Sequence, residues 1–135
     1  MARKISRKGI IKKLDDLIRD HLKETREKYC VVCGKSMDWF HPQNCPFGLQ
    51  VSHYISRDYK ALRWDLKNVE PMCIGCNYRH DKNPAPYTLY MIEKYGTERI
   101  EYLNEKRQKE RASPKPIKVF ELVELYEKLK KELNA

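Results

Sequence analysis

Two Cys-x-x-Cys pairs constrain the fold of this chain more than any other feature of its sequence. The first pair is Cys30 and Cys33, and the second is Cys73 and Cys76. Two closely spaced pairs of thiolates are a common ligand set of a tetrahedral, structural zinc site. The sequence therefore predicts one Zn²⁺ ion bound by Cys30, Cys33, Cys73 and Cys76, which would join two segments that are distant in the chain.

The composition favours a metal over disulfide bonds as the cross-link. Of the 135 residues, 35% are charged, so we expect a small hydrophobic core that gains folding free energy from metal binding. The sequence shows neither an apolar run long enough to span a membrane nor a secretory signal. We therefore expect a cytoplasmic protein with reduced thiols. The fifth cysteine, Cys45, is interpreted as a free loop thiol, with competition for the metal as the alternative.

The charge of the chain predicts an anionic partner. The formal net charge is +9 and the pI is about 9.3, and nucleic acid is the usual partner of such a basic protein. Residues 1–14 contain basic side chains and no acidic one, whereas a merely solvated face mixes its signs. We expect this segment to contact DNA phosphates through Lys4, Arg7, Lys8 and Lys12.

The hydrophobic pattern predicts an α+β fold in which helices flank a small sheet. Apolar residues at helical spacing predict an amphipathic helix over residues 7–27, with Ser6 as its N-cap. Strands are expected at 48–54 and 69–72. Further helices are expected from residue 74 to before Asn83-Pro84, at 87–95 with Gly96 as its C-cap, and at 97–111.

We divide the chain into a basic N-terminal helix (1–28), a zinc-bound core (29–96) and C-terminal helices (97–135), which together form one compact domain. After the stiff Ser113–Pro116 segment, four apolar residues repeat at spacings of four, three and four, as in a short coiled coil. These residues are Leu122, Tyr126, Leu129 and Leu133. Packing of this seam against the domain is the favoured interpretation, and a homodimer is the alternative.

The order of elements in the core is that of a ββα-metal, or HNH, nuclease site. Phosphodiester hydrolysis requires an activated water and a cation beside the scissile phosphate. His53 on the first strand can act as general base because its pKa lies near neutrality. Asn77, directly after the second cysteine pair, can bind a hard cation through oxygen. Asn68 can tie the strands together by side-chain to backbone hydrogen bonds. A purely structural role for His53 is the alternative.

Two further residues follow Asn77 at helical spacing. His80 and Asp81 lie three and four residues on, so both can share its helix face and add a ligand to a catalytic Mg²⁺ or Mn²⁺ ion. The alternative is that both belong to a solvated helix end.

The motifs around these residues resemble those of the NinG/Rap family of lambdoid phage recombination endonucleases. The resemblance runs from about Ile11 to the C-terminal helix, and the central part carries the specific motifs. It implies metal-dependent cleavage of branched DNA, such as Holliday junctions and D-loops, in a bacterial host by a protein of phage or prophage origin. The motifs are Cys30–Gly34, Ser52–Tyr54, Leu62–Trp64, Asn68-Val69, Cys73–Asn77 and Pro86-Tyr87.

One position departs from the pattern of many HNH nucleases. Ser52 stands where those enzymes place an acidic metal ligand. The NinG/Rap pattern also lacks an acid at this place, so the resemblance holds while the first ligand of the catalytic cation is left unassigned.

Basic residues surround the proposed site in the sequence and can position DNA through its phosphates. The aromatic Trp64 lies among them, either stacking on unpaired bases or packing in the core. No segment resembles a helix that reads bases in the major groove, so recognition of DNA structure is favoured over recognition of sequence. The predicted phosphate contacts are Arg57, Lys60, Arg63, Lys67, Arg79 and Lys82.

Two other functions are compatible with the same residues. The first is a non-catalytic zinc module that binds DNA or RNA, in which His53 and Asn77 are structural. The second is a zinc-stapled adaptor whose C-terminal helix binds a protein partner. Cleavage of a branched substrate distinguishes the nuclease from both.

Overall fold

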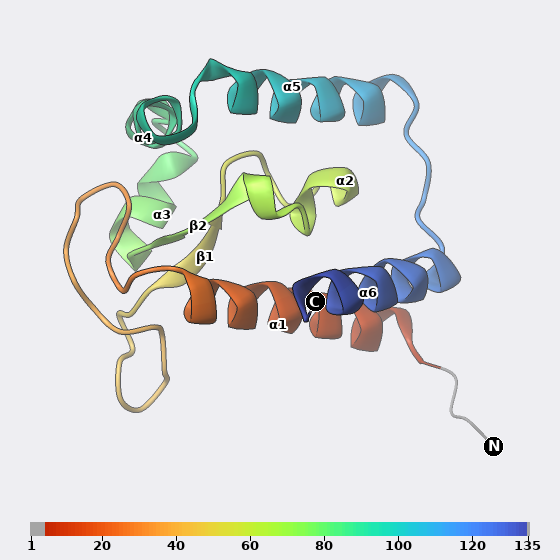
Figure 1. Ribbon diagram of the computed structural model, residues 1–135, viewed down its shortest axis with the longest axis horizontal. Helices are drawn as coiled ribbons and strands as arrows, with labels where there is room; N and C mark the ends of the chain where they lie inside the picture. The colour runs from red at the N-terminus through yellow and green to blue at the C-terminus, as the bar shows by residue number, and fades with distance from the viewer. Residues whose placement is uncertain (1–4, 135) are drawn as a thin grey trace.

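The computed structural model describes residues 5–134 as an α+β protein that is mostly helical, with one two-stranded sheet (Figure 1). Helices α1 and α6 lie side by side on one side of the sheet, and α5 lies on the other side (Figure 1). The elements are α1 (Arg7–Thr25), β1 (Gln50–His53), α2 (Lys60–Arg63), the 3-10 helix η1 (Leu66–Asn68), β2 (Val69–Met72), α3 (Ile74–His80), α4 (Ala85–Tyr95), α5 (Thr97–Ala112) and α6 (Val119–Leu133).

Most of these bounds agree with those expected from the sequence. The strand expected at 48–54 is shorter, because only Gln50–His53 pair with β2 in the antiparallel register that sets His53 opposite Val69. The short elements α2 and η1 were not expected, since neither is long enough to show a hydrophobic period. No helix within residues 5–134 is both long and apolar enough to cross a membrane.

Helix α1 forms one wall of the hydrophobic core. Its N-cap Ser6 accepts a hydrogen bond from the backbone of Gly9 at 2.9 Å, which satisfies one of the free N–H groups of the first turn. Four apolar residues, spaced four apart, are buried on its inner face: Ile10, Leu14, Ile18 and Leu22. This regular stripe explains why the sequence predicts the helix so closely.

The C-terminal seam packs against the domain, as the favoured interpretation expected. Leu122 on α6 is fully buried in the common core, and α6 lies along α1. Arg7 holds the segment just before α6, because its Nη1 donates to the carbonyl of Ile117 at 2.6 Å.

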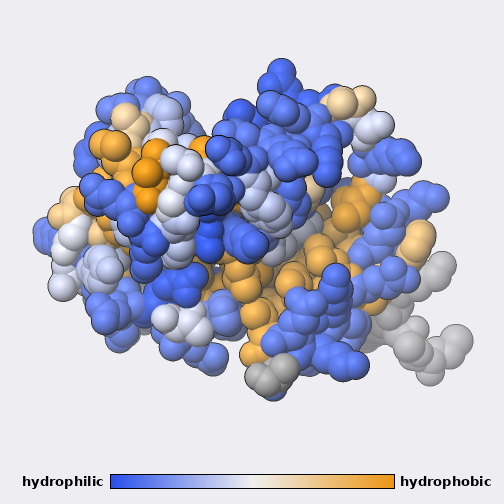
Figure 2. All heavy atoms as spheres, turned by 45° about the horizontal axis from the view of Figure 1, so that its top comes forward, coloured by the Kyte–Doolittle hydropathy of each residue, from blue (hydrophilic) through white to orange (hydrophobic). Residues whose placement is uncertain are grey.

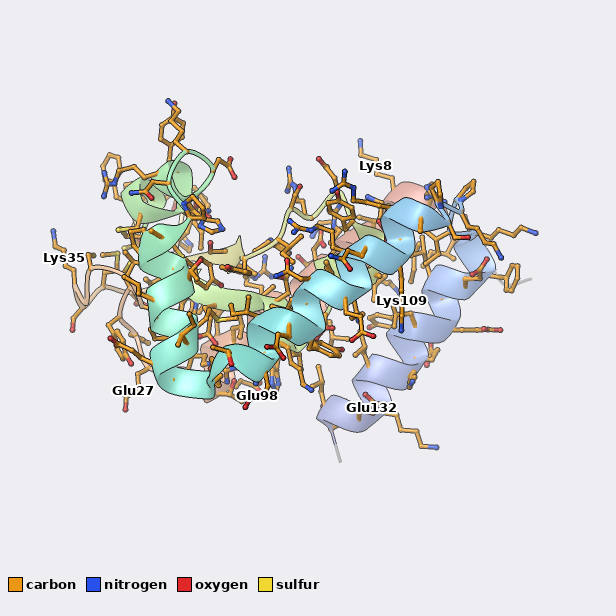
Figure 3. The ribbon with its side chains drawn as sticks, turned by 90° about the horizontal axis from the view of Figure 1, so that it is seen from above. Lys8, Glu27, Lys35, Glu98, Lys109 and Glu132 are labelled. Carbon is orange, nitrogen blue, oxygen red and sulfur yellow. The ribbon has the colours of Figure 1, made fainter. Side chains whose placement is uncertain are left out.

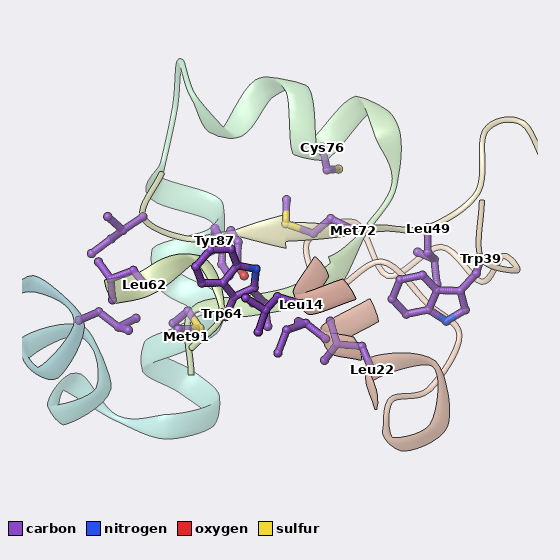
Figure 4. Packing of buried hydrophobic residues seen from close by; sticks show 14 of the residues in the cluster. Leu14, Leu22, Trp39, Leu49, Leu62, Trp64, Met72, Cys76, Tyr87 and Met91 are labelled. Carbon is purple, nitrogen blue, oxygen red and sulfur yellow. The ribbon is translucent and has the colours of Figure 1, made fainter. Parts of the chain in front are cut away.

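The core lies between α1, the sheet and the helices that follow it (Figure 4). Trp64 packs there beside Leu14 (Figure 4), and only 3% of it is exposed. Its indole Nε1 donates to Asp15 at 2.8 Å. Trp64 is therefore a core residue, and the base-stacking alternative for it is wrong.

Helix α5 is held above the sheet by polar contacts. Glu110 accepts from the backbone of Lys60 and Ala61 at the start of α2, at 3.2 and 2.7 Å, and Lys106 pairs with Asp65 at 2.7 Å. A groove of about 1030 Å³ separates α5 from α6. Figure 2 shows this hollow with hydrophobic residues on its floor and hydrophilic residues on its rims.

Candidate metal centre and active site

The four paired cysteines form one cluster. Their Sγ atoms all lie within 4.8 Å of one another, and those of Cys33 and Cys73 are 4.0 Å apart. A tetrahedral site with Zn–S bonds of about 2.3 Å requires sulfur atoms roughly 3.8 Å apart. The cluster can therefore hold a metal ion such as zinc. Cys45 is not part of it, and its Sγ instead lies 3.7 Å from the carbonyl of Asp38.

Each cysteine pair is shaped by local backbone hydrogen bonds. The N–H of Gly34 donates to the carbonyl of Cys30 at 2.8 Å, in a turn that needs the φ of +74° found at Gly34. Cys73 caps the start of α3, and its Sγ accepts from the N–H of Cys76 at 3.4 Å. The second pair thus fixes where α3 begins.

The thiols of the cluster differ in acidity. Burial raises the pKa of Cys76 to about 12. Burial also opposes ionisation of Cys30, but hydrogen bonds from the backbone of Cys33 and Cys73 outweigh it and lower the pKa of Cys30 to about 7. Four thiolates this close together repel one another, so a complete set of thiolate ligands requires a bound cation.

A second site lies on the β1 side of the sheet. Strand β1, the loop after it and helix α3 line a groove of about 600 Å³. The groove brings together four of the residues singled out in the sequence for catalysis or cation binding, namely His53, Asn77, His80 and Asp81.

Among the described residues, the side chain of His53 forms one hydrogen bond, with a backbone carbonyl. Its Nε2 lies 2.9 Å from the carbonyl oxygen of Arg63. A carbonyl can only accept, so Nε2 carries the proton and Nδ1 keeps a free lone pair. Burial lowers the pKa of His53, although the bond to Arg63 raises it in part. The lowered pKa favours the neutral imidazole, which can accept a proton at Nδ1.

The side chain of Arg63, which the sequence suggested as a phosphate contact, is engaged with an acid of α1 in the structure. This side chain is 15% exposed. Its Nε and Nη2 donate to the two carboxylate oxygens of Asp15 at 3.1 and 2.8 Å. This two-point contact fixes Arg63, the same residue whose carbonyl orients His53.

Asn77 is held by a neighbour on β1. Its Nδ2 donates to Oε1 of Gln50 at 3.2 Å. This contact uses the nitrogen of the amide, so the side-chain oxygen Oδ1 remains the atom of Asn77 that can bind a cation.

His80 is largely buried, whereas Asp81 is exposed at the end of α3. Nε2 of His80 donates to the carbonyl of Tyr54 at 2.7 Å, and its ring packs against those of Tyr54 and Tyr87. Its Nδ1 is buried and has no hydrogen-bond partner within the described chain. A histidine that donates one N–H to a carbonyl and leaves the other nitrogen free has the arrangement of a metal ligand.

Asn68 ties the segment after β1 to the segment that leads into β2. Its side chain is fully buried. Nδ2 donates to the carbonyls of Ile55 and Leu62 at 2.9 and 3.1 Å, and Oδ1 accepts from the N–H of Ile55 at 2.9 Å. These bonds set the path of the chain on both sides of His53 and Arg63.

The groove residues do not form a second ready-made metal cluster. Within residues 5–134, the four cysteines are the one group of three or more His, Cys, Asp or Glu side chains whose ligand atoms lie together. A cation in the groove would therefore depend on few protein donors, such as Oδ1 of Asn77 and Nδ1 of His80, and on oxygens supplied by water or substrate.

The predicted phosphate contacts near the site are divided among different surfaces. Arg57 is exposed and lines the groove. Arg79 and Lys82 are exposed beside a neighbouring cavity that also touches the cysteine cluster. Lys67 lines a separate pocket beside β2, and Lys60 lines the groove between α5 and α6. Only part of the expected basic surface thus adjoins the groove.

The basic N-terminal segment is partly engaged in the fold. Arg7 bonds the carbonyl of Ile117, as described above, and Lys12 pairs with Asp16 at 2.7 Å. Lys8 is exposed, and Lys4 lies outside the described residues. Among the three described residues of this set, Lys8 is thus the one whose side chain makes no such contact.

Sequence reasoning missed two residues of the site. Asp15 contacts Arg63 across 48 positions of the chain, so no spacing rule links the two. Gln50 contacts Asn77 across 27 positions. Its place in the strand expected at 48–54 was visible, but nothing in the sequence marked its partner.

Comparison with known proteins places the chain in a family. The family model described as "NinG: Bacteriophage Lambda NinG protein" matches residues 2–135. The "Protein ninG" of Salmonella phage P22 is 24% identical over 124 residues, which cover 89% of this chain and 56% of that relative. The chain thus spans little more than half of that relative's length. No solved structure matches it. The chain belongs to the NinG family of bacteriophage proteins.

Proposed function

We propose that this protein is a metal-dependent endonuclease that hydrolyses phosphodiester bonds in branched DNA, such as Holliday junctions and D-loops, in the cytoplasm of a bacterial host. One observation carries the proposal. The groove holds a histidine whose Nε2 bonds a backbone carbonyl and whose Nδ1 has no hydrogen bond among the described residues, together with an asparagine and a second histidine from the facing helix.

In the proposed reaction His53 is the general base. Its Nδ1 takes a proton from a water molecule, and the water oxygen attacks the phosphorus of the scissile phosphodiester. The bond to the leaving oxygen breaks and that oxygen takes a proton from solvent water, which yields a phosphate monoester and a hydroxyl end. The Arg63 carbonyl keeps the imidazole oriented and stabilises the protonated ring that forms.

A catalytic cation would be held by Oδ1 of Asn77 and Nδ1 of His80, and Asp81 also lines the groove. When bound, Mg²⁺ or Mn²⁺ would stabilise negative charge on the scissile phosphate and on the leaving oxygen. The mixed oxygen and nitrogen donors suit Mn²⁺ at least as well as Mg²⁺.

Zinc is the metal that we propose for the four cysteines. Cys73 and Cys76 belong to the start of α3, and Asn77 is the next residue. A metal ion at these thiols would fix the first turn of α3, and with it the position of Asn77 relative to His53 on β1. In this role the zinc ion stabilises an HNH-like core without entering the reaction.

The net charge of +9 supports DNA as the partner. Arg57 at the groove and Arg79 and Lys82 beside it are exposed and can contact phosphates. Membership of the NinG family supports a role in phage DNA metabolism, and branched DNA is the substrate class that we infer for this chain.

A non-catalytic zinc module that binds DNA or RNA is the second candidate function. It is favoured by the lack of a second His, Cys, Asp or Glu cluster within residues 5–134. In this case His53 and Asn77 would stabilise the fold only.

Cleavage assays separate the two candidates. The purified protein is incubated with labelled four-way junction, flap and linear duplex DNA, with Mg²⁺, Mn²⁺ or EDTA. The nuclease predicts cuts in branched DNA that require a divalent cation and stop in EDTA. Salt-sensitive binding without cleavage under every condition would select the non-catalytic module.

A further inference from the structure

A positively charged pocket lies on the β2 side of the sheet, away from the groove that contains His53. Its volume is about 540 Å³, and it is lined by the end of α1, by β2 and by the junction of α4 and α5. It shares no lining residue with the groove. Four basic side chains line it: Arg26, Lys67, Lys94 and Arg99.

The buried acid of this pocket is occupied by internal contacts. Glu70 is 1% exposed, and it accepts hydrogen bonds from the hydroxyls of Tyr95 and Tyr90 at 2.6 and 3.4 Å. Arg26 lies 3.6 Å from it. Burial and the charge of Glu70 both raise the pKa of Tyr95, so that hydroxyl stays protonated and keeps donating. The charge of Glu70 is thus used within the protein.

The other three cations lie over tyrosine rings. Arg99 lies 3.6 Å and Lys94 5.6 Å from the ring centre of Tyr95, and Lys67 lies 4.5 Å from that of Tyr102. None of the three forms a salt bridge within residues 5–134. The rings hold these side chains in place while their positive charge remains available to an anion.

Arg26 supplies a donor without an acceptor. Its Nε is buried and has no hydrogen-bond partner in the described structure, because 3.6 Å to Glu70 is too long for one. Buried donors nearly always have a partner. Arg26 therefore keeps unused hydrogen-bonding capacity beside the pocket.

The acids nearby limit the net charge but do not cancel it. Glu27 also lines the pocket, and Glu27 and Glu98 both lie at this end of the molecule, where α4 meets α5 (Figure 3). Four basic residues against Glu27 and Glu70 leave an excess of two positive charges in the lining. Such a pocket favours a phosphate group over a neutral ligand or a cation.

We infer that this pocket binds a phosphate of the DNA backbone at a second point, away from the groove in which a strand is cut. The inference rests on the proposed function. A second anchor would add affinity through counterion release and would not touch the reacting atoms. Loss of the anchor should therefore change substrate binding and leave the chemical step unchanged.

The test is steady-state cleavage of a labelled four-way junction by Lys94→Gln/Arg99→Gln. We expect KM to rise about tenfold or more and kcat to remain that of the parent. The slope of log affinity against log salt should fall by up to about 2, because each lost phosphate contact contributes about 0.9. The control, Lys130→Gln/Arg111→Gln, removes two exposed cations elsewhere, of which Lys130 also lies over a tyrosine ring. The KM, kcat and salt slope of this control should match those of the parent.

A second variant, Lys67→Gln/Lys94→Gln, changes only exposed side chains, so the test does not depend on whether removal of Arg99 disturbs the fold. Unchanged KM and salt slope in both variants, beside a parent that cuts, would overturn this inference alone. A lower kcat at unchanged KM would overturn it as well. A parent that binds junctions but never cuts them would overturn the nuclease proposal, and the affinity and salt slope would still test the pocket.

Discussion

The carboxylate of Asp15 holds the guanidinium of Arg63 through two hydrogen bonds, of 2.8 and 3.1 Å. Arg63 in turn accepts from Nε2 of His53 through its backbone carbonyl at 2.9 Å. Helix α1 is thereby linked to the imidazole in the groove, although it lies outside the segment between the two cysteine pairs. We regard Asp15 as a positioning residue for His53.

Replacement of Asp15 tests this link. Asp15→Ala removes three hydrogen bonds, two from Arg63 and one from Trp64. We expect the free energy of unfolding to fall by about 1–3 kcal/mol. The neighbouring Asp16→Ala loses only surface pairs and should change it by no more than about 0.5 kcal/mol. Equal stability of the two variants in chemical denaturation would contradict the role of Asp15.

The contribution of Asp15 to the free energy of unfolding should depend on pH. Burial would raise the pKa of Asp15, but the hydrogen bonds from Arg63 and Trp64 outweigh it and lower that pKa below the ordinary value of an aspartate. A group with a lowered pKa stabilises the fold above its unfolded pKa and stops doing so as pH falls through its folded pKa. The stability difference between parent and Asp15→Ala should therefore be constant near neutrality and shrink below about pH 4.

Cys73→Ser tests the metal centre. The variant removes one thiolate of the cluster, so we expect loss of bound zinc and of the cooperative thermal transition, since metal-binding free energy contributes to folding. Cys45→Ser should keep the zinc content and Tm of the parent. Zinc is measured by elemental analysis. A Cys73→Ser protein that folds and retains one zinc per chain would rule out this ligand set.

Asn68→Ala tests the chain path around the groove. The change leaves the N–H of Ile55 and two carbonyls without their partner in a fully buried position. We expect a loss on the order of 3 kcal/mol in unfolding free energy. Activity per folded molecule should also fall. Calorimetry measures the loss of stability, and cleavage at low temperature, where the variant stays folded, measures the loss of activity. A variant as stable as the parent would show that these bonds contribute nothing net.

Asn77→Ala should act on the cation and not on the fold. The side chain is half-buried, and within the described residues its amide forms one hydrogen bond, to Gln50. Tm should therefore change little. The Mn²⁺ or Mg²⁺ concentration that gives half-maximal cleavage should rise, because an oxygen ligand is lost. An unchanged metal requirement would remove Asn77 from the proposed ligands.

Much of the fold follows from local patterns in the sequence. The stripe from Ile10 to Leu22 determines α1 through its regular burial, and the spacing of the cysteines correctly predicts their cluster. The grouping of His53 with Asn77 also follows, because the second cysteine pair starts the helix that carries Asn77 beside the strand that carries His53.

The contacts that could not be predicted join distant segments. Arg63 looked like a phosphate contact because charge alone does not reveal an acid 48 residues away that is brought near by packing. Lys67 follows the unexpected short helix α2, and the turn through η1 carries it to the β2 side of the sheet. Sequence distance from a motif is thus a poor guide to which cations adjoin a groove.

The most direct test of the central claim is the single-turnover cleavage rate of His53→Ala on a four-way junction, with saturating protein and Mn²⁺. The control is His21→Ala, which changes a histidine of α1 outside the groove. Loss of a general base predicts a rate lower by about a hundredfold to ten-thousandfold, with the zinc content, the fold and the junction affinity of the parent retained. A folded His53→Ala protein that cuts the junction as fast as the parent would contradict the proposed mechanism.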